Sequence, residues 1–336
     1  MSNQIPDINN GILDLGLNED LSPDPKLELD QIDNNNDNKF VNDINGSFVI
    51  DFAYAYSLRE LFKLLTCINC EVGTFVIRQD GILYVNNNGN NRVITTIKMH
   101  SEQFVRYEFS SSTGTILLAL NIKMFYSILS KIAKSESFRI YKQGGDNRVY
   151  FQVLSDTKSQ ISDDEVAYIN PEPSVEIKDF TAPQYNRSDI DPNCVISTGA
   201  INNLCKDMKT TDCESMRFYF FPKGLHVAPI KFNKYRAFKF GQVDESANAT
   251  PSLNKLPITN GMNRVNNVNT ITKITVKPRN LVEEFNLHKT FVYSLSGINN
   301  INPRGVVKFY AENNKPLKIV SSIGDYGTLQ LFITKN

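Results

Sequence analysis

The sequence has no tryptophan, only three histidines and only five cysteines in 336 residues, and these scarcities exclude several kinds of site. A structural zinc site needs four Cys or His ligands at set spacings, and the one close pair, Cys67 and Cys70, has no second pair to complete it. The odd number of cysteines also argues against a disulfide framework, so we expect reduced thiols in an intracellular protein. No apolar run approaches the roughly 20 residues of a membrane helix, so we expect no membrane-spanning segment.

The motifs of common catalytic sites are missing as well. There is no Gly-x-x-x-x-Gly-Lys phosphate loop, no Gly-x-Ser-x-Gly elbow and no His-Glu-x-x-His helix. His100, His226 and His288 have no evident carboxylate or nucleophile partner. The stretch 33–44 begins like a calcium loop, but its sixth position is Asn38 rather than Gly. We therefore expect a protein that is not an enzyme and that holds no metal or cofactor.

Charge is unevenly distributed, although Lys+Arg and Asp+Glu both number 36. Residues 1–46 hold ten acidic residues against Lys26 and Lys39, so the remainder has eight more basic than acidic residues. This stretch is rich in Asn, Asp and Pro, offers little to bury, and lacks the basic-then-apolar layout of a signal peptide. We expect residues 1–46 to be a disordered acidic tail.

From residue 47 the chain repeats one pattern twice, with short alternating strands and two amphipathic helices in each copy. The expected helices are 57–67, 122–134, 198–209 and about 287–296. A stretch without clear period, 171–191, separates the copies and is expected to be a connector, while a polar insertion interrupts the second copy at about 244–269. The pattern predicts an α+β fold with two similar domains, 47–170 and 192–336.

Basic side chains lie on the helix faces opposite the apolar stripes. In the first helix, for example, the apolar residues recur at the spacing of one helix face, and Arg59 and Lys63 lie on the other. The residues on such faces are Arg59, Lys63, Lys123, Lys131, Lys134, Lys206 and Lys209. Faces of this kind are either simply solvated or contact phosphates without reading bases.

Four stretches match one known family in order and spacing. Three of them are 96–109, 118–133 and 201–208, which match a strand pair and two helices of that family. The fourth, Ile323-Gly324-Asp325-Tyr326-Gly327-Thr328-Leu329, is similar to an Ile-Ala-Asp-Met-Gly-His-Leu signature between two C-terminal strands. On these residues the chain resembles the eukaryotic-type DNA sliding clamp family, proliferating cell nuclear antigen, over about 48–336 apart from the insertion.

The resemblance implies a homotrimeric ring in which each chain has two clamp domains. The helices would line a central hole that encircles double-stranded DNA without sequence specificity, and the sheets would form an outer shell. Such a clamp is a processivity factor that tethers DNA polymerase and other replication and repair proteins, and a clamp loader places it on DNA. Arg59 and Lys206 fall on basic DNA-facing positions of the family, and Lys289 is the basic residue of the fourth helix. The expected location is the nucleus or a cytoplasmic viral replication site.

The resemblance also implies two protein contacts. Ring closure comes from edge strands that pair between subunits, and the matching residues are Asp164, Glu165, Val166 and Tyr168 on one edge and Tyr235, Ala237, Phe238 and Phe240 on the other. Partner peptides dock into an apolar pocket whose matching residues are Val175, Ile177, Phe180, Pro316 and Phe332. The Asn-rich loop after Val85 and the final Thr334-Lys335 depart from the family, and Pro316 and Phe332 could instead be ordinary core.

Two other functions are compatible with the residues. A monomeric clamp-fold processivity or transcription factor would hold one face of DNA by electrostatics, and its binding would collapse with salt. A metal-dependent nuclease would use Asp and Glu residues of the connector or the insertion.

Overall fold

The computed structural model describes residues 43–68, 70–87, 93–133, 136–154, 166–172, 191–209, 214–230, 238–242 and 280–335. Within these residues the protein is a mixed α and β structure, mostly antiparallel sheet with few helices. The expected α+β class agrees with this at that level. The predicted acidic tail as far as residue 42, the insertion at 244–269 and most of the connector at 171–191 lie outside the described residues. The predicted domain boundaries stay a prediction.

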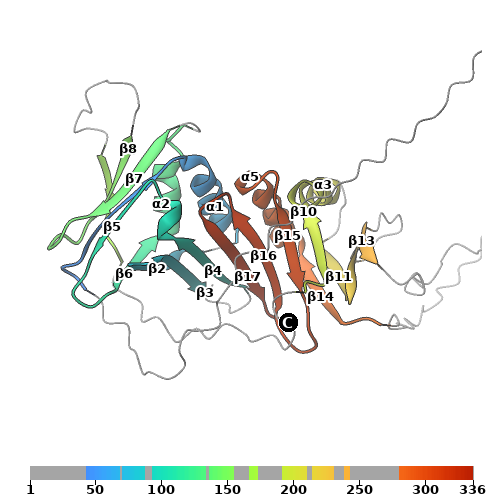
Figure 1. Cartoon of the computed structure of the whole chain (residues 1–336). Coiled ribbons are helices and arrows are strands. Elements are labelled where there is room, and N and C mark those ends of the chain that lie inside the picture. The colour runs from blue at the N-terminus through green and yellow to red at the C-terminus, as the bar shows by residue number, and fades with distance from the viewer. Residues whose placement is uncertain are drawn as a thin grey trace, which may run out of the picture. The chain divides into compact units, whose positions relative to one another are not determined.

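The first half of the described chain alternates strands with two helices (Figure 1). Its elements are β1 (Ser47–Phe52), α1 (Ala55–Cys67), β2 (Val72–Arg78), β3 (Gly81–Asn87), β4 (Val93–His100), the 3-10 helix η1 (Ser101–Gln103), β5 (Arg106–Ser110), β6 (Ile116–Asn121), α2 (Ile122–Leu129), β7 (Ser137–Lys142), β8 (Val149–Leu154) and β9 (Val166–Ile169).

The second half follows the same order, except that one strand rather than two is described between its fourth strand and the next helix. Its elements are β10 (Cys194–Ser197), α3 (Thr198–Lys209), β11 (Ser215–Phe221), β12 (Lys223–Pro229), β13 (Phe238–Gln242), β14 (Glu283–His288), α4 (Lys289–Ser294), the 3-10 helix η4 (Leu295–Gly297), α5 (Ile298–Ile301), β15 (Val306–Tyr310), β16 (Leu317–Ile323) and β17 (Gly327–Ile333).

The described strands form three sheets. The first half contributes a five-stranded sheet in the order β5-β1-β7-β8-β9, and the second half a four-stranded sheet in the order β13-β12-β11-β14. The third sheet has eight strands, β10-β15-β16-β17-β4-β3-β2-β6, and contains strands of both halves. Its two parts meet where β17 pairs antiparallel with β4, from Gly327 opposite Met99 to Ile333 opposite Val93. Backbone hydrogen bonding therefore continues across the boundary between the halves.

The predicted helix faces are the faces that the structure buries. In α1 the residues Leu58, Leu61, Phe62 and Leu65 are all at most 1% exposed, because their spacing of three and four residues places them on one side of a 3.6-residue helix. Strand β1 buries its apolar side chains at period two, at Phe48, Ile50 and Phe52, and Asp51 between them is buried in an ion pair with Arg139. These local periods give the sheets and helices one shared apolar core.

The second predicted helix is shorter than expected. It was predicted to reach residue 134, but α2 ends at Leu129. After Leu129 the backbone hydrogen bonds change to a spacing of three residues: the Lys131 N–H donates to the Ile128 carbonyl and the Ile132 N–H to the Leu129 carbonyl, both at 3.1 Å. Lys131 therefore follows the helix rather than lying on it, and Lys134 lies outside the described residues.

The fourth predicted helix starts later than expected, because a strand precedes it, and the helical stretch also runs further than expected. Strand β14 occupies Glu283–His288 and pairs with β11, and the helical stretch continues through η4 and α5 to Ile301. The alternation of buried Phe285 and Leu287 with Glu284 and Asn286 is a period-two signal that the sequence analysis missed.

The chain before β1 is fixed to the first half by two charged groups. The ammonium of Lys142 is buried and donates to the carbonyls of Ile44 and Gly46 at 2.7 and 2.8 Å. The Asp43 carboxylate accepts from the backbone N–H of Ser112 at 2.6 Å and from its hydroxyl at 2.9 Å. These bonds lower the pKa of the Asp43 carboxyl to about 2, and the bond from the backbone N–H of Ser112 contributes most.

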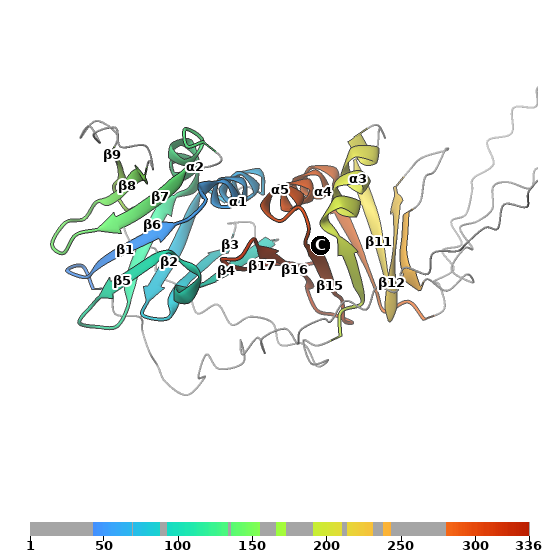
Figure 2. The ribbon, with the colours of Figure 1, turned by 45° about the horizontal axis from the view of Figure 1, so that its top comes forward.

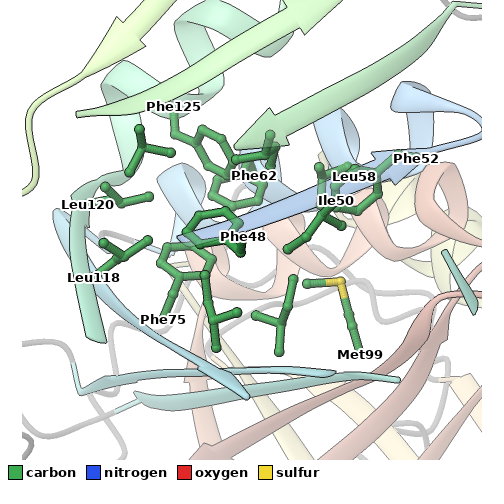
Figure 3. Close-up of a pocket in the computed structure, with 14 residues that line it drawn as sticks. Phe48, Ile50, Phe52, Leu58, Phe62, Phe75, Met99, Leu118, Leu120 and Phe125 are labelled. Carbon is green, nitrogen blue, oxygen red and sulfur yellow. The ribbon is translucent and has the colours of Figure 1, made fainter. Parts of the chain in front are cut away.

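An apolar cavity of about 30 Å³ lies in the core of the first half, and Figure 3 shows the side chains around it. Phe48, Phe62, Phe75 and Phe125 are among its lining residues, and Val149 also faces it. Phe62 and Phe125 meet edge to face with ring centroids 4.0 Å apart. Because no polar group lines the cavity, a bound water would have no hydrogen-bond partner there.

Candidate nucleic-acid interface

The helices lie together on one side of the sheets. Figure 2 shows α2, α1, α5, α4 and α3 in a row, and the packing agrees: α1 contacts α2 and α5, while α3 contacts α4 and α5. Helices from both halves thus form one continuous surface. The sequence predicted the helices, but only the tertiary structure places them beside one another.

This row of helices is rich in positive charge. Its five α-helices contain Arg59, Lys63, Lys123, Lys206, Lys209 and Lys289, and their acidic residues are Glu60 and Asp207. Glu60 is 6% exposed and accepts from the side-chain amide of Asn300 on α5 at 3.2 Å. One of the two negative charges is therefore buried between helices, which leaves the outward surface predominantly basic.

Arg59 is held by protein groups. Its side chain is 19% exposed, donates to the carbonyl of Ile132 at 3.2 Å and lies 3.4 Å from a Glu60 carboxylate oxygen. Its guanidinium also lies 4.8 Å from the centre of the Tyr56 ring. These contacts tie α1 to the segment after α2, and a direct contact between Arg59 and DNA stays a prediction.

The predicted lysines of the first half are more available. Lys63 has a 52% exposed side chain, and its ammonium lies 3.8 Å from Glu60. Lys123, near the start of α2, and Lys131, just after its end, are both exposed. The start of α2 is fixed because the Asn121 side chain accepts from the backbone N–H of Met124 at 3.0 Å. Lys123 is thus carried by a capped helix.

The predicted basic residues of the second half lie at helix ends. Lys206 and Lys209 are exposed in the last turn of α3, where a positive charge also complements the helix dipole. Lys289 is half-buried at the first position of α4. His288 caps that helix, since its Nδ1 accepts from the backbone N–H of Thr290 at 3.3 Å. A role for Lys289 at DNA stays a prediction.

Two of the predicted interface segments are edge strands. Val166 and Tyr168 lie on β9, at one edge of the five-stranded sheet, and Phe238 and Phe240 lie on β13, at one edge of the four-stranded sheet. Tyr168 is 51% exposed. The other four predicted interface residues, Asp164, Glu165, Tyr235 and Ala237, lie outside the described residues.

The predicted peptide pocket is only partly described. Phe332 is 1% exposed on β17, and Pro316 is half-buried just before β16. Val175, Ile177 and Phe180 lie outside the described residues. The chain end nearby is attached to β14, because the Lys335 ammonium pairs with the Glu283 carboxylate. The pocket stays a prediction.

Tyr326, in the turn between β16 and β17, joins the two halves in a way that sequence reasoning missed. Its hydroxyl accepts from the backbone N–H of Tyr54 at 3.0 Å and lies 3.3 Å from the Tyr54 carbonyl, at the start of α1. Its ring centroid lies 5.4 Å from that of Phe52 and 5.9 Å from that of Phe104. Helix α1 has no side-chain cap of its own. Tyr326 belongs to the signature 323–329 that the sequence analysis identified, but nothing in the sequence predicted its contact with Tyr54.

The described residues offer little for covalent or metal chemistry. No group of three or more His, Cys, Asp or Glu side chains close enough to hold a metal ion occurs among them. Cys70 is buried while Cys67 is exposed, and burial raises the pKa of the Cys70 thiol to about 11. Burial also raises the pKa of Cys194 to about 11 and that of Cys205 to about 12. In the part of the chain that the structure describes, no helix is both long and apolar enough to cross a membrane.

Comparison with known proteins adds no relative: no family model matches the chain, and no curated protein matches its sequence.

Proposed function

We propose that this protein is a DNA sliding clamp, a processivity factor that closes into a ring around double-stranded DNA and performs no chemistry itself. One observation carries the proposal. The joint between the two halves is an antiparallel pair of β17 and β4, and the counterparts of these two strands, β9 and β13, are both edges of the sheets that the described strands form. A second copy could therefore add its β13 to β9 and repeat the joint.

The correspondence of these strands follows from the repeated element order. In each half, β9 or β17 is the last strand of a three-stranded run, β7-β8-β9 or β15-β16-β17. In each half, β4 or β13 is the fourth strand and pairs with the third. Open edges are a liability unless they are paired or protected, so pairing between copies would also explain why both edges persist.

The charge of the helices supports DNA as the ligand. Phosphate contacts supply sequence-independent affinity and let a protein slide, because they release counterions without reading bases. Lys63, Lys123, Lys206 and Lys209 are exposed on the row of helices. A ring would enclose DNA with this surface, so retention would depend on topology as well as on charge.

The number of copies and the partners come from the resemblance to sliding clamps. We propose a homotrimer that a clamp loader places on DNA and that tethers DNA polymerase and other replication proteins through short peptides. Tethering raises the effective concentration of an enzyme at its template without any new catalytic group.

The first experiment measures solution mass by light scattering over a concentration series. A mass of about three times 38.1 kDa is expected. A protein that stays monomeric at every concentration would refute the ring and favour the one-sided DNA-holding factor.

The second experiment compares circular and linear duplex DNA after a loader, or transient opening of the ring, has assembled the complex. Retention on circles at salt concentrations that abolish ordinary electrostatic binding is expected, together with release when the circle is cut. Equal loss from circles and linear DNA as salt rises would contradict encirclement. Cleavage of DNA that requires a divalent metal would instead support the nuclease alternative.

A further inference from the structure

Three tyrosines form a row across the five-stranded sheet. Tyr141 on β7 is opposite Tyr150 on β8, and Tyr150 is opposite Tyr168 on β9. The ring centroids of Tyr141 and Tyr150 are 5.1 Å apart with planes within 14°, and those of Tyr150 and Tyr168 are 6.3 Å apart. The guanidinium of Arg148 lies 4.8 Å from the Tyr168 ring centroid. The row ends at the edge of the sheet, where Tyr168 is the exposed member.

The eight-stranded sheet contains a comparable row at the joint between the halves. Tyr310 on β15 is opposite Lys318 on β16, which is opposite Phe332 on β17. The Lys318 ammonium lies 5.2 Å from the Tyr310 ring centroid. This row does not end at an edge, because Phe332 is opposite Ile94 on β4. It therefore crosses the joint.

The two rows occupy corresponding positions. Phe151 is opposite Ala167 in one half and Ile319 is opposite Leu331 in the other, and both pairs point into the core or pack against it. The next residues along the last strands are Tyr168 and Phe332. Tyr168 thus corresponds to Phe332 on the opposite face of the sheet from these core pairs.

Exposure separates the corresponding side chains. Phe332, beside β4, is 1% exposed, and Lys318 is 7% exposed. Tyr168, with no described strand beyond β9, is 51% exposed. A large aromatic side chain that is buried where the joint is filled and exposed where it is open is suited to anchor a protein contact.

We propose that the aromatic row Tyr141-Tyr150-Tyr168, with Arg148 over its last ring, is the anchor of the contact between two copies of this chain. Its partner is the β13 edge of a second copy, which occupies the place that β4 occupies beside Phe332. The inference rests on the proposed ring and adds to it which side chains supply the affinity. Tyrosine and arginine are the residue types that most often dominate such contacts, because they bury a large rigid surface and retain a polar end.

The chain contains no tryptophan, so the fluorescence of one introduced tryptophan reports on its own surroundings and tests the proposal directly. The Tyr168→Trp variant places one reporter at the end of the row, and the Tyr54→Trp variant places one at another exposed tyrosine, 64% exposed, at the start of α1. In the assembled protein the first variant is expected to emit at shorter wavelength and resist acrylamide quenching, and to lose both properties on dilution. The second variant is expected to emit as an exposed tryptophan throughout. Exposed-type emission from Tyr168→Trp in the assembled protein would overturn the proposal.

Truncation measures the contribution of the anchor. We expect Tyr168→Ala to raise the dissociation constant of the assembly by about 30-fold or more, since truncating an anchor residue costs about 2 kcal/mol or more. Tyr54→Ala is expected to leave it unchanged, and circular dichroism checks that both variants fold. If the wild type assembles and Tyr168→Ala assembles equally well, the anchor is refuted while the ring stands. A wild type that remains monomeric refutes both.

Discussion

The hydroxyl and the ring of Tyr326 should make separable contributions to stability. The change Tyr326→Phe removes only the hydroxyl, and Tyr326→Ala removes the ring as well. The hydroxyl makes one good hydrogen bond, at 3.0 Å from the Tyr54 nitrogen, and one long contact, at 3.3 Å from the Tyr54 oxygen. The ring packs against Phe52 and Phe104 and is 6% exposed.

These contacts fix the expected magnitudes. Loss of about one effective hydrogen bond at the start of α1 should cost about 1 kcal/mol of unfolding free energy. Loss of the buried ring should cost about 3 to 5 kcal/mol, because the neighbouring aromatic rings can close only part of the space left behind. Tyr168→Phe is the matched control, measured where the protein is dilute enough to be monomeric. Its exposed ring should make that change cost less than about 0.5 kcal/mol.

The assay is urea unfolding followed by circular dichroism, with the slope checked for constancy among variants. The order expected is control, then Tyr326→Phe, then Tyr326→Ala, with a clear gap at each step. Equal losses of unfolding free energy for the two Tyr326 variants would mean that the hydroxyl, and not the ring, supplies the stabilisation. Negligible loss for Tyr326→Ala would mean that the contacts of Tyr326 with Tyr54, Phe52 and Phe104 do not stabilise the protein, and would refute the magnitudes expected from them.

Three further predictions concern the cavity, the chain before β1 and the basic helices. Val149→Ile, which adds one methyl group toward the cavity of about 30 Å³, should stabilise the protein by about 0.7 kcal/mol at 24 cal/mol per Å³, and a lowered urea midpoint would show that the site is already full. Because the pKa of the Asp43 carboxyl is lowered to about 2 in the folded protein, ionised Asp43 stabilises the fold above about pH 4, and this stability is lost as pH falls toward 2. In Asp43→Asn the urea midpoint should therefore change less between about pH 4 and pH 2 than in the wild type. An unchanged pH profile would contradict the Ser112 contacts. Lys206→Gln and Lys209→Gln should each reduce the salt dependence of DNA binding by about 0.9 in log–log slope where that lysine contacts a phosphate, without changing the solution mass, and a changed mass would place α3 at a subunit contact instead.

Local periodicity determined much of the secondary structure in advance. Leu58, Leu61 and Leu65 of α1 repeat at the helix period, and α3 begins and ends where its pattern predicts, at Thr198 and Lys209. Local reasoning failed at the end of α2 and at the start of the fourth helix. The backbone turns more tightly than an α-helix after Leu129, and the alternation around Phe285 formed a strand before the fourth helix.

The sequence by itself therefore determined which faces of the helices are apolar, which are basic, and that one order of elements occurs twice, because these properties depend on residues a few positions apart. Only the tertiary structure decided which strands lie beside each other, because pairing joins residues far apart in the chain. It paired β17 with β4, placed Tyr326 at the start of α1, and turned Arg59 toward Ile132. It also left Tyr168 51% exposed on the edge strand β9, whereas its counterpart Phe332, on β17 beside β4, is 1% exposed.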